Sequence, residues 1–234
     1  MLNIFSIGII LMLIGYIIGG WKNGVVKETV SLIGIIVVFF LSYLLMGVVG
    51  NFLCTIMPFF KFDGLVSLNI LIYQAIAFFL LFSLFMIIYR LLLKISSGLQ
   101  KLINATIILI IPSKILGAII GFISGWISIF IILLVLLVPL KDYNQFKDST
   151  VNNTILFNTP ILSDTVKPFT KGAIEIYDIS SKIVNKKIDM NEANLKSINI
   201  MLKYKLVDKN TIEKLIESKK LDKIKNLNSI LSNY

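Results

Sequence analysis

Four long apolar stretches, none with an ionisable residue near its middle, dominate this chain of 234 residues. They cover about residues 2–20, 30–49, 68–93 and 116–138. A helix needs roughly 20 residues to cross a bilayer core that is about 30 Å thick. Each stretch is therefore long enough to span a membrane. The sequence predicts an all-α, polytopic membrane protein with four transmembrane helices.

The charged residues are concentrated in the last part of the chain. Residues 1–140 hold seven Lys/Arg and two acidic residues, whereas residues 141–234 hold sixteen and eleven. This contrast predicts a membrane domain over residues 1–140 followed by a water-soluble tail. Residues 141–189, rich in Asn and Thr and containing Pro160 and Pro168, are expected to form an extended connector with a short helix. Residues 190–234 are expected to form a small helical unit, with Asn210 and Glu213 resembling a capping box.

A fifth apolar stretch, residues 102–111, is too short to cross a bilayer and lies between Lys101 and Pro112. A segment of this length is typical of interfacial or re-entrant structure. We therefore expect a short interfacial or re-entrant segment before the fourth span.

Basic residues in short loops stay on the cytoplasmic side and so indicate orientation. The loop between spans two and three holds only Lys61, beside Asp63. The first and third loops hold six basic residues: Lys22, Lys27, Arg90, Lys94, Lys101 and Lys114. This asymmetry predicts that both termini are extracytoplasmic, although the lysines of a long tail do not themselves decide its side.

Small residues recur at helical spacing in the first and fourth spans. In "SKILGAIIGFISGWISIF", residues 113–130, three glycines follow one another four residues apart: Gly117, Gly121 and Gly125. The first span ends with two such pairs, Gly15 with Gly19 and Gly20 with Gly24. In lipid, helices associate through close backbone approach at small residues. These glycines predict tight packing of spans one and four, either on each other or across a dimer.

Residues that would carry chemistry are scarce. Histidine is absent and Cys54 is the single cysteine, so we expect no catalytic residue, cofactor or metal site, and no enzyme. Gln74 is the most polar residue deep in a span. We interpret it as a polar core residue that makes an interhelical hydrogen bond, in preference to a pore-lining residue. Nucleic-acid binding is not expected.

Two motifs carry a resemblance to a known family. The stretch "GWKNGVVKETVSLIG" and the glycine-rich fourth span resemble the two signatures of the colicin V production protein (CvpA) family. The first signature is roughly Arg-Gly-φ-φ-Arg-Glu-φ-φ-Ser-Leu, and the residues that sit on it are Gly24, Lys27, Glu28, Ser31 and Leu32. Asn23 and Lys27 replace the two arginines. In the second signature, Asp-Arg-φ-φ-Gly-xxx-Gly-xx-Arg-Gly, three residues depart from the pattern: Ser113, Lys114 and Ser124.

The resemblance implies a multi-pass protein of the bacterial plasma (inner) membrane, linked to colicin V export and envelope homeostasis, with no established biochemical activity. We expect a non-catalytic scaffold or accessory subunit that forms a homo-oligomer or binds a membrane protein. The alternative is a small-solute channel or transporter built by oligomerisation of the four-helix unit.

Two further contacts are left open by the sequence. Glu28 is either a charge at the positive end of the second span's helix dipole or the partner of a basic residue such as Lys114. The lysines of "KKLDKIKNLN", residues 219–228, either contact anionic lipid or form a solvated basic face.

Overall fold

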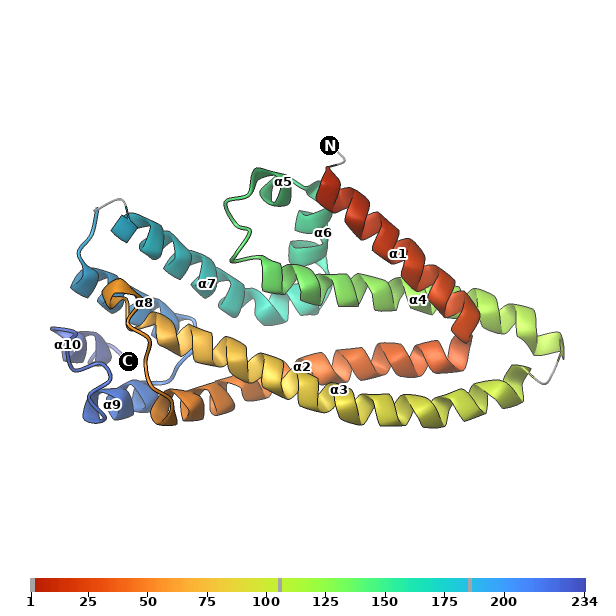
Figure 1. The fold of residues 1–234 in the computed structure, drawn as a ribbon, viewed down its shortest axis with the longest axis horizontal. Helices are drawn as coiled ribbons and strands as arrows, with labels where there is room; N and C mark the ends of the chain where they lie inside the picture. The colour runs from red at the N-terminus through yellow and green to blue at the C-terminus, as the bar shows by residue number, and fades with distance from the viewer. Residues whose placement is uncertain (1–2, 105–106, 185–186) are drawn as a thin grey trace. The chain divides into compact units, whose positions relative to one another are not determined.

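The computed structural model describes residues 3–104, 107–184 and 187–234. Over these ranges the regular elements are helical, which confirms the all-α prediction (Figure 1). In chain order they are α1 (Ile4–Asn23), α2 (Val25–Ile56), the 3-10 helix η1 (Phe62–Gly64), α3 (Leu68–Asn104), α4 (Ile107–Leu136), α5 (Asn144–Lys147), α6 (Thr150–Asn158), α7 (Leu162–Val184), α8 (Met190–Lys203), α9 (Lys209–Glu217) and α10 (Leu227–Leu231).

Within the described residues, four helices are long and apolar enough to cross a bilayer. Their spans are Ile4–Asn23, Val25–Ile56, Leu68–Leu91 and Ile111–Leu136, so the four predicted transmembrane helices are confirmed by length and composition. α2 has 32 residues, which is about 48 Å of helix and more than one crossing requires. It continues until Ile56 because the first proline after its start is Pro58, and helices usually end before the residue that precedes a proline.

The predicted interfacial or re-entrant segment, residues 102–111, falls partly outside the described residues. Residues 102–104 end α3 and residues 107–111 begin α4, whereas 105–106 are not described. Pro112 lies inside α4, close to its start, where proline removes a single backbone hydrogen bond. The re-entrant segment therefore stays a prediction.

The chain divides into two compact units, which share the long helices α2 and α3. Unit 1 comprises residues 1–41 and 82–164, and unit 2 comprises residues 42–81 and 165–234. The predicted boundaries at 140 and 189 follow a change in composition, whereas these units follow contacts. The two divisions therefore do not coincide.

In unit 1, the start of α1 lies against the residues that follow α4 (Figure 1). The hydroxyls of Ser6 and Ser149 are hydrogen-bonded at 3.0 Å, and both residues are buried. The ring of Phe5 packs edge-on against Tyr143 and Phe146, with centroids 5.8 and 5.5 Å apart. These contacts place the beginning of the first span and the end of the fourth together, as an even number of crossings requires.

The predicted extended connector is mostly helical, which corrects the expectation for residues 141–189. It contains α5, α6 and α7. Ser149 caps α6 by accepting a hydrogen bond from the Asn152 N–H at 3.2 Å. α7 has an amphipathic pattern that buries Val166, Ala173, Ile176 and Ile179 along one side. The prolines and asparagines of this segment are typical of a loop. The side-chain cap of α6 and the row of buried apolar residues on α7 nevertheless favour helices.

In unit 2, the tail packs on the membrane helices and does not form a core of its own. The predicted small helices over 190–234 are present as α8, α9 and α10. Their buried residues, such as Ile198 and Met201, belong to the same cluster as Cys54 of α2 and Ile70 of α3. The cap of α9 is Asp208, two residues before the proposed cap Asn210, and its side chain accepts from the Thr211 N–H at 3.2 Å.

The tail is also tied to the segment that joins α2 and α3. The side chain of Asn194 accepts a hydrogen bond from the Ser67 N–H at 2.9 Å and donates one to the Gly64 carbonyl at 2.8 Å. Asn194 is buried, and so is Ser67. The tail is therefore held against the loop between the second and third spans.

Candidate functional site: the corner between α1, α2 and α4

A tight turn joins the first two membrane helices in unit 1. α1 ends at Asn23, and the Gly24 N–H donates to the Gly20 carbonyl at 2.9 Å. Gly24 has a φ of 76°, in the left-handed region that glycine adopts without strain. α2 begins immediately afterwards at Val25. The turn predicted from Asn23-Gly24 is thus present, and it explains why this signature position holds glycine.

The glycines of α4 meet the end of α1 by backbone contact. A Cβ added to Gly117 would overlap the Gly20 carbonyl and lie 2.9 Å from the Gly24 Cα. A Cβ on Gly121 would lie 2.5 Å from the Tyr16 carbonyl oxygen. Neither position has room for a side chain, because real Cβ atoms do not approach backbone this closely. The groove that the α4 glycines leave is filled by α1 of the same chain.

On the α1 side, this contact uses one of the two small-residue pairs named from the sequence, Gly20 with Gly24. A Cβ on Gly15 or Gly19 would have nothing within 4 Å, whereas Gly20 is buried against α4. Tyr16, Gly20 and Gly24 form the contacting face, with the Tyr16 ring against Gly125. The end of α1 contains two glycine pairs with the same spacing, Gly15 with Gly19 and Gly20 with Gly24. The spacing alone does not indicate which pair contacts α4. Among the described residues, nothing packs against Gly15 or Gly19.

A polar network lies directly beside this corner. Glu28 is 4% exposed, although it carries a carboxylate. Asn23 donates from Nδ2 to Glu28 Oε2 at 3.1 Å and accepts at Oδ1 from Lys27 Nζ at 2.9 Å. The Asn23 amide therefore connects the lysine to the carboxylate. Among the contacts of the described residues, Glu28 has Asn23 as its side-chain partner and no ion pair joins it to Lys114.

Ser113 of α4 caps the start of α2 from a neighbouring helix. Its hydroxyl accepts a hydrogen bond from the Val25 N–H at 3.3 Å, and the side chain is buried. The first backbone N–H groups of a helix have no partner within the helix, so an external acceptor satisfies one of them. The aspartate that the second signature places here would be a charged acceptor for the same N–H. The replacement by serine keeps the cap and removes its charge.

Two further signature residues lie on α2 one turn along. Ser31 accepts a hydrogen bond at 2.8 Å from the hydroxyl of Tyr89, a buried residue of α3. Gly34 faces the ring of the same tyrosine, where a Cβ would overlap it. Leu32 is half-buried. The residues of the two signatures, about 90 positions apart in the sequence, therefore converge at one corner that joins α1, α2 and α4, with α3 held nearby.

The family described as Colicin V production protein matches residues 5–160, well over half of the chain. The chain belongs to this family. Its members are associated by that description with toxin production, and the matched range contains the whole corner. No curated protein and no solved structure matches the chain at a significant level. The apolar helices and the family together indicate a multi-pass membrane protein.

Gln74 belongs to unit 2. It is 1% exposed and packs on α2, where a Cβ on Gly50 would lie 2.8 Å from its Cγ. Its Nε2 donates to the carbonyl of Leu206 in the turn after α8, and its Oε1 has no partner among the described residues. The residue is buried as predicted. Its hydrogen bond, however, reaches the tail and not another span, which corrects the predicted partner.

Lys220 is a residue whose role the sequence did not reveal. Its Nζ donates to the carbonyls of Cys54, Thr55 and Met57 at 2.6, 2.7 and 2.8 Å, and it lies 5.3 Å from the centroid of the Phe59 ring. The last carbonyls of a helix lack partners, and a lysine satisfies them. Burial lowers the pKa of the Lys220 ammonium. In the sequence Lys220 is indistinguishable from Lys219, Lys223 and Lys225, but in the structure these three are exposed and Lys220 is half-buried.

Proposed function

We propose that the protein acts without catalysis, as a membrane scaffold or accessory subunit in toxin secretion or envelope homeostasis. The observation that carries this proposal is that the signature residues make structural contacts between helices. Gly24, Gly117 and Gly121 allow backbones to touch, and Ser113 caps a helix. Glu28, the carboxylate of the signature, is buried and hydrogen-bonded to Asn23. These residues join helices and present no reactive group to a substrate.

A structural role of this kind requires a partner, which is a membrane protein or a second copy of the chain. Gly15 and Gly19 lie on a face of α1 that α4 does not cover. Small residues on an uncovered face allow the helix of another membrane protein to approach closely. Unit 2 adds a folded platform to the membrane helices, because the tail shares its core with α2 and α3. Both features support assembly with a partner in the bacterial plasma membrane.

The test measures toxin export in a producing strain that carries Gly117→Leu, with Ile119→Leu as the control on the same helix. Ile119 is 54% exposed, so its change to leucine should be nearly neutral. We expect toxin export to fall in the Gly117→Leu variant. The amount of each variant in the membrane is measured in parallel. Solute efflux from vesicles that contain the purified protein tests the alternative. If solute efflux depends on the protein and falls in Gly117→Leu, the proposed scaffold function would be wrong and a channel function would take its place.

A further inference from the structure

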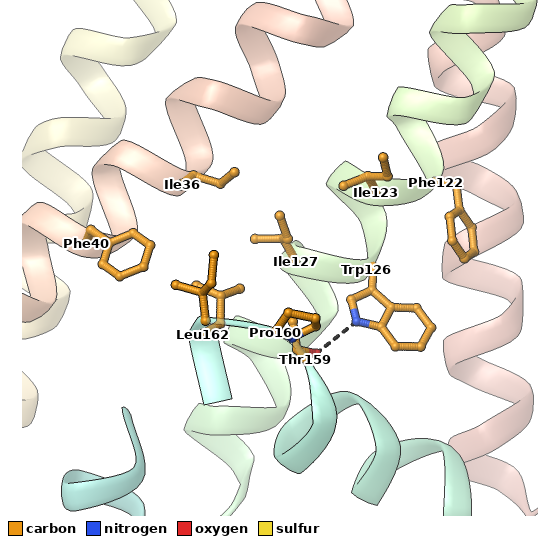
Figure 2. Close-up of a pocket in the computed structure, with 10 residues that line it drawn as sticks. Ile36, Phe40, Phe122, Ile123, Trp126, Ile127, Thr159, Pro160 and Leu162 are labelled. Atoms are coloured by element: carbon orange, nitrogen blue, oxygen red, sulfur yellow. Dashed lines mark hydrogen bonds between the residues drawn. The ribbon is translucent and has the colours of Figure 1, made fainter. Parts of the chain in front are cut away.

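The groove between α2 and α4 in unit 1 is apolar, and the polar side chain in its wall is already paired. Ile36 of α2 lies on one side of it and Ile123 of α4 on the other (Figure 2). The Thr159 hydroxyl accepts a hydrogen bond from Trp126 Nε1 at 2.9 Å. Nothing in the structure shows what covers this groove, so it identifies no ligand. The end of α2 in unit 2 differs, because polar groups converge there on a group that the structure shows.

Three backbone carbonyls and an aromatic ring surround one cation at the end of α2. The carbonyl oxygens of Cys54, Thr55 and Met57 lie 2.6, 2.7 and 2.8 Å from Lys220 Nζ. The centroid of the Phe59 ring lies 5.3 Å from the same nitrogen. The last carbonyls of a helix lack partners within it and carry the negative end of its dipole. We call these three carbonyls and the ring the ammonium site.

Contacts with α3 fix the ammonium site without help from the tail. The hydroxyl of Tyr73 donates to the Pro58 carbonyl, and the Phe59 ring packs on the Tyr73 ring with centroids 6.1 Å apart. The side chain of Asn69 accepts from the Phe60 N–H and donates to the Phe60 carbonyl, both at 2.8 Å. All these contacts lie within residues 58–73. The site therefore keeps its form when the lysine side chain of the tail is absent.

The geometry of the site selects a primary ammonium ion. Such an ion has three N–H donors and no acceptor, so three carbonyls that converge on its nitrogen satisfy it completely. A guanidinium spreads its donors in one plane, which does not match acceptors gathered around one point. The face of an aromatic ring attracts a cation at the observed distance. The ligand class is therefore an amine of the form R–NH₃⁺.

We propose that the end of α2 and the loop before α3 form a binding site for a primary ammonium ion, which Lys220 occupies as a tethered ligand. The site and its ligand are separate parts, because α2 and the loop supply one and the tail supplies the other. A free primary amine therefore binds there once the Lys220 side chain is absent, and it restores the docking of the tail. In the natural chain the free amine does not compete, because a tethered group has an effective concentration of about millimolar or more.

Rescue of a variant by a free amine tests this proposal in the full chain. Lys220→Ala removes the side chain beyond Cβ, and propylammonium supplies the same chain of atoms. Cys54, buried in the core that α2 shares with the tail, reports detachment of the tail by its reaction with an aromatic disulfide reagent, which amines do not consume. In detergent, Lys220→Ala should react faster than the natural chain. Propylammonium chloride should slow this reaction by about fivefold or more, because a ligand of the docked state stabilises that state.

Lys220→Met is the matched variant, because its side chain fills the space that propylammonium would take. The amine should therefore not slow the reaction of Cys54 in Lys220→Met. Sodium chloride and tetramethylammonium chloride at the same ionic strength should not slow the reaction in Lys220→Ala, because neither cation has an N–H donor. Should Lys220→Ala be poorly folded without the amine, recovery of its helicity and of Cys54 protection on addition of propylammonium decides the same question.

Three results would each overturn the proposal. Equal slowing by propylammonium and by either control salt would mean that ionic strength alone restores docking. Equal slowing in Lys220→Ala and Lys220→Met would mean that the amine acts elsewhere on the chain. Absence of slowing with every salt would mean that the three carbonyls do not bind a free ammonium ion.

Discussion

The contact between Lys220 and the end of α2 leads to a prediction about the docking of the tail. Its ammonium donates to three carbonyls at 2.6 to 2.8 Å. Hydrogen bonds to a charged group contribute about 1.5–3 kcal/mol each, so the gross contribution is roughly 5–9 kcal/mol. Burial lowers the pKa of Lys220, which shows that desolvation offsets part of this gain. After substitution, water can also hydrogen-bond to the three carbonyls, which reduces the net loss of free energy. We therefore expect Lys220→Met to weaken docking by about 2 kcal/mol, or roughly 30-fold.

Cys54 reports this change without further engineering. It is the single cysteine, is 0% exposed and lies in the core that α2 shares with the tail. Maleimide reaches its thiol when the tail detaches, so the labelling rate follows the population of the open state. In detergent, Lys220→Met should raise this rate roughly 30-fold at unchanged helicity. Lys223→Met, at an exposed lysine three residues on, should have no effect. Equal labelling in both variants would refute the stabilising role of Lys220.

Three further predictions concern the packing of the membrane helices and the side of the membrane on which the loops and the tail lie. Gly117→Ala should destabilise the protein by about 1–3 kcal/mol, because its Cβ has no room beside Gly20; thermal unfolding in detergent measures this, and a change no larger than that of Ile119→Leu would contradict it. Ser113→Ala should cost about 1 kcal/mol by leaving the Val25 N–H without its cap, whereas Ser113→Asp should be at least as stable as the natural chain; similar melting of all three would remove the cap from the account. In a Cys54→Ser background, single cysteines at Lys61, Gln145 and Lys223 should react with an impermeant reagent added from outside; labelling of Lys61 without Lys223 would contradict the contact of Asn194 with Gly64.

The sequence predicted the spans because their signal is strong and local. An uncharged apolar run of about 20 residues has few structures available to it in a bilayer. The regular spacing of the α4 glycines was an equally local signal. Residues four apart lie on one face of a helix, so only one packing face was possible. On α1 this signal left two pairs, Gly15 with Gly19 and Gly20 with Gly24, because their spacing is equal and only the partner helix selects one of them.

Contacts between distant residues were beyond such reasoning. The tail looked like a separate small unit because its own pattern of apolar residues is complete. Its core nevertheless includes Ile70 and Cys54, more than 100 residues earlier in the chain. Lys220 differs from its neighbouring lysines only through the carbonyls that meet it. A signal for the connector did exist, since the buried positions of α7 recur at helical spacing, but its prolines and asparagines outweighed it.

The last prediction concerns Asn23, which stands where the signature has a basic residue. An arginine there would bring a charge and a bidentate fork to Glu28. Asn23 instead offers one neutral donor, at 3.1 Å from Oε2. A buried carboxylate that loses its donor is left with an uncompensated charge, so Asn23→Ala should cost about 1–3 kcal/mol. Once Glu28→Gln has removed the charge, the same change should cost less. The two substitutions should therefore be non-additive by about 1 kcal/mol in a double-mutant cycle of unfolding in detergent. Additivity to within about 0.3 kcal/mol would show that this hydrogen bond carries no energy. Glu28 would then act only through its place near the start of α2, where a carboxylate contributes about 0.3–1 kcal/mol without any partner.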